Sequence, residues 1–399
     1  MRILAHNASP VLGGGEIWTA RLLNGLRERG HEILMLCRNA EVAGRVAAEG
    51  IASRVLVLGG DALLSDALRL AWVLRRHRTQ ALLLTTFKKT WLGGLGARLA
   101  RVPRVVARVA IAGHVPRNFT YRVALLRLVD AVAVNAEELR APFLARLPRL
   151  APERLVTIYD GVSAPRRQTP KGTLRRALQL PPEAGVFGTL ARLVPQKRLD
   201  RFVEALALLP AQVHCVVGGE GPERTALEAH AQRLGVAGRL HLLGFRSDAG
   251  DVLDALDVLA LCSDREGMAN AMLEAMAAGV PVVSTPVSGA AEALEPLADG
   301  EAPGVLCGFE PRELASAIHA LLCDPSRRAR MAEAGPRRVQ ERFSRRQMLD
   351  RWEAFLSARG LGPEEQIEPA RSTCGDGQTT TFSRTGNRWR DRRAHGPRP

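Results

Sequence analysis

Aromatic residues are scarce in this chain: Phe, Trp and Tyr together make up 4% of its 399 residues, although apolar residues as a class reach 46%. Long apolar runs are absent, since no stretch approaches the roughly 18–20 residues that a membrane-spanning helix needs. The opening MRILAHNASP has only three apolar residues before a turn. It therefore predicts a first β-strand and is too short for the apolar core of a secretory signal.

Cysteines are also few, and the six in the chain form no C-x-x-C pair and no cluster with histidine. Four of them lie inside apolar, strand-like runs: Cys37, Cys215, Cys262 and Cys307. This pattern predicts buried thiols in a reducing compartment and argues against a disulfide framework. We therefore expect a cytoplasmic protein.

Common metal and cofactor motifs are missing as well. The chain has no D-x-D and no acidic or histidine cluster with metal-ligand spacing, so we expect no metal ion. A G-x-G-x-x-G fingerprint is absent, as is G-x-x-x-x-G-K-[ST], which excludes the usual nicotinamide, flavin and P-loop sites. We expect no cofactor.

Acidic residues are under-represented in the first part of the chain. The net charge is +15, and residues 1–162 hold 24 Lys and Arg against 12 Asp and Glu. A basic surface attracts phosphates, anionic lipid or nucleic acid. The alternative, an arginine-rich protein whose cations are simply solvated, stays open from the sequence.

Two basic segments of this first part also carry apolar residues. Residues 87–104 (FKKTWLGGLGARLARVPR) and 117–129 (RNFTYRVALLRLV) mix Lys and Arg with Trp, Phe, Tyr and Leu. This composition suits peripheral contact with an anionic membrane, or a phosphorylated glycolipid. The alternative is that the leucines pack inward and the arginines are solvated.

Strand-like and helix-like runs alternate along most of the chain, which predicts βαβ units and parallel sheets covered on both faces. A polar break at 163–182 separates two such series, so we expect two doubly wound domains at 1–162 and 183–340. Residues 341–358 predict a closing helix. Residues 359–399 lose apolar periodicity and predict a disordered basic tail. In doubly wound sheets ligands bind beyond the carboxyl ends of the strands.

Three loops hold candidate ligand-binding residues. SPVLGGGEIW follows the first strand, and Gly14 and Gly15 allow close backbone approach at a helix N-terminus, although a tight turn explains them equally well. In ARLVPQKRLD, Arg192 and Lys197 follow a strand and suit a diphosphate, against the alternative of two surface cations. In VVGGEGPER the glycines again permit close approach of a ligand.

The segment DREGMANAMLEAMAAGVPVV carries two glutamates, Glu266 and Glu274, eight positions apart. Eight helical residues span about 12 Å, too far to share a metal but suited to opposite ends of an extended ligand. We expect a helix from Asn270 that stops at Gly279. The alternative is an ordinary core helix, but Glu274 has almost wholly apolar neighbours and requires a partner.

Together these motifs resemble glycosyltransferase family 4, the retaining, group 1 type of transferase with the GT-B fold. The matching stretches are GGGE, ARLVPQKRLD (family pattern G-R-L-x-x-x-K-G), GGEGPER (G-x-G-P), TIYDGV (N-G-V) and the Glu-x7-Glu segment. The likeness covers residues 1 to about 358. It implies an α/β fold of two doubly wound, Rossmann-like domains that face an interdomain cleft, with C-terminal helices crossing back.

The resemblance also implies a donor site. Arg192 and Lys197 would bind the diphosphate of a nucleotide-sugar, and Glu274 its ribose. Glu266 would hold the donor sugar together with the backbone of Gly267 and Met268.

Asn270 would join this donor site at the start of the helix, while Gly14 and Gly15 would face the phosphate and the acceptor. His114, in the loop ARVAIAGHVPRN, lies where relatives often place a histidine against the transferred sugar, so we predict a catalytic role for it beside Glu266.

Three positions depart from the family pattern: Ala191 replaces a Gly, Arg198 replaces a Gly, and Asp160 replaces the Asn of N-G-V. None of them removes a predicted ligand group. The resemblance implies metal-independent transfer with retention, in which the two cations and a helix N-terminus stabilise the departing diphosphate. The expected acceptor is a glycan or glycolipid of cell-surface polysaccharide such as lipopolysaccharide, reached at the inner face of the membrane.

Two other functions stay open at this stage. A nucleotide-sugar epimerase could use the same fold, but the Glu-x7-Glu pattern supplies no catalytic carboxylate and histidine pair for it. A nucleic-acid-binding protein is suggested by the charge and the tail. The chain lacks interleaved aromatics and any recognised reading motif, so we expect no nucleic-acid partner.

Overall fold

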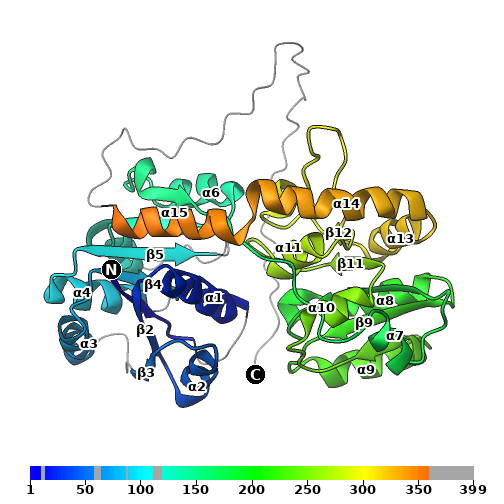
Figure 1. The fold of residues 1–399 in the computed structure, drawn as a ribbon, viewed down its shortest axis with the longest axis horizontal. Coiled ribbons are helices and arrows are strands. Elements are labelled where there is room, and N and C mark those ends of the chain that lie inside the picture. Colours follow the sequence, from blue (N-terminus) through cyan, green and yellow to red (C-terminus); the bar gives the residue numbers. More distant parts are fainter. Residues whose placement is uncertain (10–13, 58–63, 87–88, 111–118, 359–399) are drawn as a thin grey trace, which may run out of the picture. The chain divides into compact units, whose positions relative to one another are not determined.

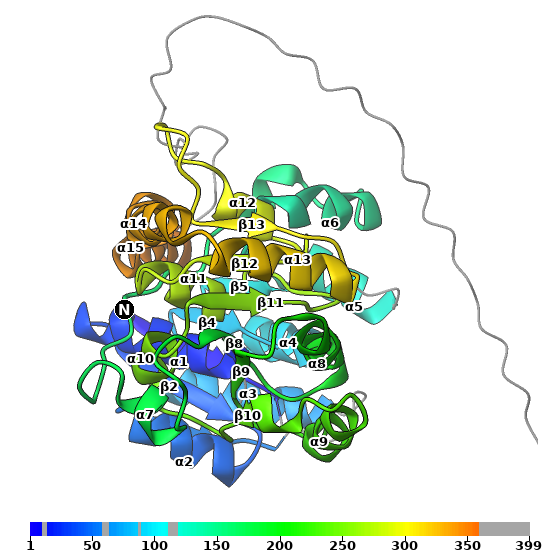
Figure 2. The same ribbon diagram turned by 90° about the vertical axis from the view of Figure 1, so that its right-hand side faces the viewer.

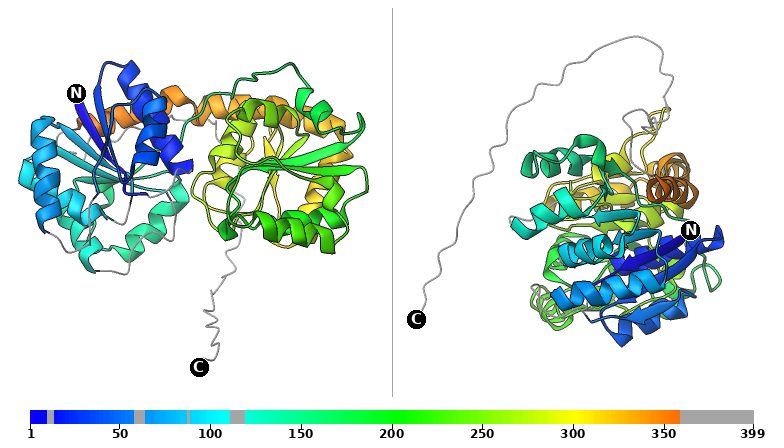
Figure 3. Two further views of the ribbon diagram at one scale, coloured as in Figure 1. Left: turned by 90° about the horizontal axis from the view of Figure 1, so that it is seen from below. Right: turned by 90° about the vertical axis from the view of Figure 1, so that its left-hand side faces the viewer.

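The computed structural model describes residues 1–9, 14–57, 64–86, 89–110 and 119–358. His114 therefore lies outside the described residues, as does the predicted tail. The described residues belong to one compact unit that contains two parallel β-sheets, one of seven strands and one of six. Helices cover both faces of each sheet (Figure 3). The predicted α/β fold of two doubly wound sheets is confirmed.

The first sheet is built from residues near the start of the chain, with strand order β3-β2-β1-β4-β5-β6-β7. Its strands are β1 (Arg2–His6), β2 (Glu32–Cys37), β3 (Ser53–Val55), β4 (Ala81–Leu84), β5 (Arg104–Val109), β6 (Ala131–Val134) and β7 (Leu155–Thr157). Its helices are α1 (Gly14–Glu28), α2 (Ala40–Ala48), α3 (Leu64–Arg76), α4 (Thr90–Ala100), α5 (Phe119–Val123) and α6 (Arg140–Arg146).

The second sheet has the strand order β10-β9-β8-β11-β12-β13. Its strands are β8 (Gly185–Leu190), β9 (Val213–Gly218), β10 (Leu240–Leu242), β11 (Val258–Leu261), β12 (Val282–Ser284) and β13 (Gly304–Leu306). Its helices are α7 (Thr173–Ala177), α8 (Leu199–Leu208), α9 (Arg224–Arg233), α10 (Ala249–Asp254), α11 (Asn270–Ala277), α12 (Ala290–Leu294) and α13 (Pro311–Leu322).

The strands form because their sequences are short, apolar runs that are buried on both faces, as parallel sheets require. In β4 and β6 every residue is buried. Covering helices bury one apolar stripe each, and capping fixes some of their ends. The side chain of Asn39 caps α2 and accepts from the backbone N–H of Val42 at 2.9 Å.

Two helices end the described chain, α14 (Pro325–Arg342) and α15 (Arg345–Ser357). Helix α14 packs beside α11 of the second sheet, whereas α15 packs along β5 of the first sheet (Figures 1 and 2). Trp352 and Phe355 of α15 belong to the same buried core as Trp18 of α1. The closing helix thus returns to the first sheet, as predicted, and joins its core rather than extending the second one.

Candidate active site

Each sheet has one point where the chain reverses its direction of winding. In the second sheet this point lies between β8 and β11, because the strands after β8 extend one way and those after β11 the other. The crevice at such a point, beyond the carboxyl ends of the strands, is the usual ligand site of an open α/β sheet. Here its walls are the loops 191–198 and 262–269.

The loop after β8 carries the two predicted diphosphate ligands. Arg192 is exposed, and Lys197 ends a short 3-10 turn and is largely buried. The ammonium group of Lys197 donates to a carboxylate oxygen of Glu266, in the loop after β11. The structure thus joins one predicted phosphate ligand to one predicted sugar ligand, while Arg192 lies in the same loop, five residues earlier.

The backbone conformation of Arg198 explains why the family pattern has a glycine at this position. Its backbone has φ 49° and ψ 44°, the left-handed region that glycine adopts most readily. The Arg198 guanidinium donates to Asp200 at 2.8 Å and to Asp264 at 3.3 Å, and the carboxylate of Asp200 raises the arginine's pKa above its ordinary value. These ion pairs offset part of the cost of a side chain in this conformation.

The glycines of VVGGEGPER have a structural explanation that differs from the predicted one. A Cβ atom on Gly219 would lie 1.9 Å from the carbonyl oxygen of Ala191, and one on Gly221 would lie 2.3 Å from that of Leu193. Both glycines are needed because their loop packs against the loop after β8. Close approach of a ligand is not required to explain them.

The loop after β11 leads into α11, which starts at Asn270 as predicted and is followed by Gly279 with φ 74°. Glu266 is only 9% exposed, and Met268 is buried. The Oδ1 atom of Asn270 is buried and has no hydrogen-bond partner among the described residues. An unpartnered buried acceptor at a helix N-terminus is an unsatisfied group that a ligand donor could engage.

Glu274 is 8% exposed and lies in the second turn of α11, between side chains of the apolar core. A buried carboxylate requires a partner, and here that partner is Arg21 of α1, whose guanidinium donates to Glu274. Arg21 itself is about half exposed. Sequence reasoning missed Arg21, because its partner lies 253 positions later in the chain.

Gly267 lies in close contact with residues of the first sheet. A Cβ atom there would be 1.8 Å from the carbonyl oxygen of Ala110, after β5, and 2.6 Å from Oδ1 of Asn135, after β6. No other residue type fits this site without displacement of the loop. Gly267 is thus a packing requirement of the loop that carries Glu266.

Asn135 belongs to a buried polar network that sequence reasoning also missed. Arg108 of β5 donates from Nη2 to both carboxylate oxygens of Asp160 at 2.8 Å, and Asn135 donates to Asp160 at 2.9 Å. The guanidinium carbon of Arg108 lies 3.6 Å from the ring centroid of Trp18. Asp160 replaces the family's Asn, and the buried Arg108 supplies the counter-charge for this replacement.

The winding of the first sheet reverses between β1 and β4. Gly14 and Gly15 begin α1 beside this point, both are exposed, and a Cβ atom on either would meet nothing within 4 Å. His6, at the end of β1, is buried, and burial with the nearby charge of Lys89 lowers its pKa to about 4. It is therefore neutral at pH 7.

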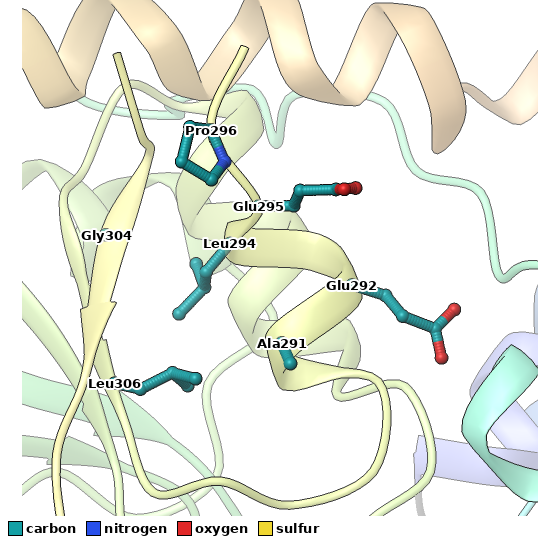
Figure 4. A pocket seen from close by; sticks show the side chains of 7 residues that line it. All are labelled: Ala291, Glu292, Leu294, Glu295, Pro296, Gly304 and Leu306. Atoms are coloured by element: carbon teal, nitrogen blue, oxygen red, sulfur yellow. The ribbon is translucent and has the colours of Figure 1, made fainter. Parts of the chain in front are cut away.

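A surface hollow lies elsewhere, between α12 and β13 (Figure 4). Its two carboxylates already have partners. Glu292 accepts from the backbone N–H groups of Glu137 and Glu138 at 3.0 and 2.9 Å, and Glu295 pairs with Arg338 at 2.6 Å. None of the predicted site residues lines this hollow, so it does not support a donor site.

The two basic segments contain both buried and exposed side chains. In 87–104, Leu92 and Arg104 are buried, so Leu92 follows the alternative in which the leucines pack inward, and Arg104 is not a solvated cation. Arg104 donates from Nε to the carbonyl oxygen of Phe355 and lies over its ring. In the described part of 117–129, Phe119 and Val123 are exposed.

Two features are absent from the described residues. They contain no group of three or more His, Cys, Asp or Glu side chains that could hold a metal ion. Within the same part of the chain, every helix is too short or too polar to cross a membrane.

Comparison with known proteins adds three observations. The profile of the family described as "Glycosyl transferases group 1" matches residues 170–338, which include every predicted donor residue of the second domain. The lipopolysaccharide core biosynthesis glycosyltransferase LpsE of Rhizobium meliloti is 29% identical over 353 residues, which cover 87% of this chain and 96% of that protein. The D-inositol 3-phosphate glycosyltransferase of Xylanimonas cellulosilytica is 33% identical over 297 residues, 67% of this chain and 70% of that protein.

Among solved structures, Anabaena Alr3699/HepE in complex with UDP-glucose matches with a TM-score of 0.79 at 24% identity. The match covers 90% of this chain and 99% of that chain. At this identity the likeness shows a shared fold.

Proposed function

Because the chain belongs to the group 1 glycosyltransferases, we propose that it transfers a sugar, with retention, from a nucleotide-sugar to a hydroxyl of a glycan or glycolipid acceptor. The observation that carries this proposal is the arrangement around α11. Lys197 and Glu266 meet at the winding reversal of the second sheet, and the buried Glu274 lies in the second turn of the helix that starts there.

In this proposal the second domain binds the donor. The carboxylate of Glu274 accepts hydrogen bonds from the two ribose hydroxyls, which replace Arg21 as its partners. Arg192 and Lys197 bind the diphosphate, so that Lys197 exchanges Glu266 for a phosphate oxygen. Glu266, released from Lys197, accepts hydroxyls of the transferred sugar, and the unpartnered Oδ1 of Asn270 supplies a further acceptor.

The chemical step follows from these positions. As the bond from the sugar to the diphosphate breaks, negative charge develops on the departing phosphate. Two cations beside the N-terminus of α11 stabilise this charge, the role that a metal ion has in other transferases. Retention then requires that the acceptor hydroxyl attack from the face that the phosphate leaves. We keep Gly14, Gly15 and His114 as predicted contacts to phosphate, acceptor and transferred sugar.

The acceptor side of the proposal rests on charge and on relatives. Residues 1–162 hold 24 basic against 12 acidic residues, which suits a phosphorylated acceptor. LpsE is named for lipopolysaccharide core biosynthesis, and we propose a related acceptor in lipopolysaccharide or another cell-surface polysaccharide. The enzyme would then work in the cytoplasm, in peripheral contact with the inner face of the membrane.

Donor binding provides the direct test. UDP-, GDP- and ADP-sugars are added singly, and thermal unfolding is followed, since a ligand of the native state raises its melting temperature according to affinity. UDP-glucose is the first choice, because HepE is similar in fold and was solved with it. Stabilisation by one nucleotide class, followed by acceptor-dependent release of that nucleotide, supports the proposal; stabilisation by none contradicts it.

The variant Glu274→Gln tests the site itself. Hydrogen bonds to a charged group contribute about 1.5–3 kcal/mol, so loss of the carboxylate should weaken nucleotide binding about 10- to 100-fold. Glu228→Gln is the matched control, since Glu228 is half exposed in α9 and pairs with Arg224 in the same helix. Unchanged nucleotide affinity in Glu274→Gln, with normal affinity in the control, would place the donor elsewhere.

A further inference from the structure

Helix α3 has two apolar faces, although a helix that covers a sheet needs only one. Its inner face packs on the first domain through Ala67, Leu70, Ala71 and Leu74, all of which are buried. Its outer face carries Leu64, Leu68 and Trp72 at a spacing of four residues. Residues at this spacing form a ridge along one side of a helix.

This outer ridge is open to solvent. Leu64, Leu68 and Trp72 are 60%, 54% and 60% exposed. A shallow groove runs beside them, lined by Leu56, Leu68, Arg69, Trp72 and Val73. Val55 and Val57, at and just after the edge strand β3, are also about half exposed. Five of the twelve exposed large apolar side chains of the described chain thus lie within residues 55–72, and such clustering marks an interaction site.

The ridge is bordered by cations. Arg69 lines the groove, and its Nη1 atom lies 3.4 Å from the carbonyl oxygen of Val57. The guanidinium carbon of Arg76 lies 5.5 Å from the centroid of the Trp72 ring. The acidic residue of the helix, Asp66, is buried on the inner side and pairs with Arg69. The outer face of α3 therefore combines apolar side chains with positive charge and presents no carboxylate.

We propose that this face of α3 docks on the surface of an anionic lipid bilayer. Trp, Leu and Arg on one helix face are the composition of interfacial helices, whose apolar side chains enter the headgroup boundary by about 5–10 Å. The arginines bind lipid phosphates while their stems lie along the apolar residues. The net positive charge of residues 1–162 attracts the same surface.

A second copy of the chain is a weaker fit to this ridge. The ridge from Leu64 to Trp72 extends about 12 Å along the helix axis. A standard protein interface buries on the order of 800 Å² per partner, an area well beyond one helix face of this length. Two copies would also bring their arginines together. An anionic bilayer needs only a few inserted side chains and supplies the opposite charge.

Vesicle binding by the full-length protein tests the proposal without donor or acceptor, so its failure is distinct from failure of the proposed transfer reaction. The probe is a vesicle of phosphatidylcholine with one quarter phosphatidylglycerol, compared with phosphatidylcholine alone. We expect binding to the anionic vesicles that weakens with salt. The double variant Leu68→Ser/Trp72→Ser should lower the partition coefficient about 25-fold, or about fivefold for each half-exposed side chain.

Two control variants test whether loss of any exposed apolar side chain weakens vesicle binding. Leu208→Ser removes an exposed leucine of α8 in the second domain, and Phe119→Ser removes an exposed aromatic of α5. We expect both to bind vesicles like the wild type, and all variants to keep the wild-type melting temperature. If Phe119→Ser abolishes binding while the α3 double variant binds normally, the docking surface is the 117–129 segment and the proposal is wrong.

Fluorescence gives a second measurement. Of the five tryptophans in the chain, Trp18 and Trp352 are buried and Trp72 is 60% exposed, so insertion should add a shift to shorter wavelength that comes from Trp72. The conservative variant Trp72→Phe should keep vesicle binding and lose this shift. Two results would overturn the proposal: a shift that persists in Trp72→Phe, or a dimeric wild type that the α3 double variant converts to a monomer.

Discussion

Asp160→Asn is the most informative perturbation of the first domain, because it restores the residue that the family pattern carries and yet should destabilise this chain. The Asp160 side chain is 2% exposed and accepts from Arg108 and Asn135. Asparagine at 160 leaves the Arg108 guanidinium, itself 7% exposed, without its counter-charge. Removal of one partner of a buried ion pair costs about 3–5 kcal/mol.

Two features of the network place the expected cost at the lower end of that range. The asparagine oxygen can still accept from Arg108, and the guanidinium lies over the Trp18 ring, an arrangement that stabilises a buried cation by about 1–2 kcal/mol. We therefore expect a loss of about 3 kcal/mol in the free energy of unfolding. For a domain of this size the melting temperature should fall by about 6–12 °C.

Urea unfolding followed by tryptophan fluorescence measures this loss. The double variant Arg108→Gln/Asp160→Asn, which removes both charges, should be less destabilised than the sum of the two single variants by about 2 kcal/mol. Glu228→Gln is the control, since its surface pair with Arg224 should contribute less than about 1 kcal/mol. An Asp160→Asn variant within 0.5 kcal/mol of the wild type would refute the assignment of a buried, charge-balanced pair.

Two further predictions concern Gly267 and His6. In Gly267→Ala the new Cβ would lie 1.8 Å from the Ala110 carbonyl oxygen, so the loop must shift and carry Glu266 with it. We therefore expect turnover to fall at least about tenfold while nucleotide still stabilises the protein. Normal turnover in this variant would contradict the prediction. His6 has a pKa of about 4, below its ordinary value of 6.5, so between these values only the unfolded chain takes up the proton. Stability should therefore fall by about 3 kcal/mol from pH 7 to pH 4. His6→Gln should flatten this dependence in pH-dependent urea unfolding, and an unchanged slope would contradict the assignment.

Local sequence patterns anticipated most of the site scaffold. Helix α11 was predictable because an apolar, helix-forming stretch lies between Asn270 and Gly279. The predicted start agrees with the structure. The loops after β8 and β11 were predictable at the same edge of a sheet, since alternating strands and helices imply parallel order, whereas the adjacency of β8 and β11 comes from the sheet topology. These features depend on residues close together in the chain.

The glycines and the basic segments show where such patterns do not suffice. The loop that packs against Gly219 and Gly221 is sufficient to explain both glycines. Leu92 and Arg104 belong to a basic, apolar segment that suited a membrane, yet both are buried. Composition shows that a segment is amphipathic, but only packing determines which of its faces is covered. On α3, for which the sequence patterns predicted no membrane contact, an apolar face remains exposed.

By itself, then, the sequence determined the α/β class, the two series of parallel strands and the candidate donor loops, because hydrophobic periodicity and turn residues act over a few positions. The tertiary structure decided the partners of the charged groups: Arg21 for Glu274, Lys197 for Glu266 and Arg108 for Asp160. A buried charge needs a counter-charge at contact distance, and the fold can bring that group from any point of the chain. No local pattern encodes that choice.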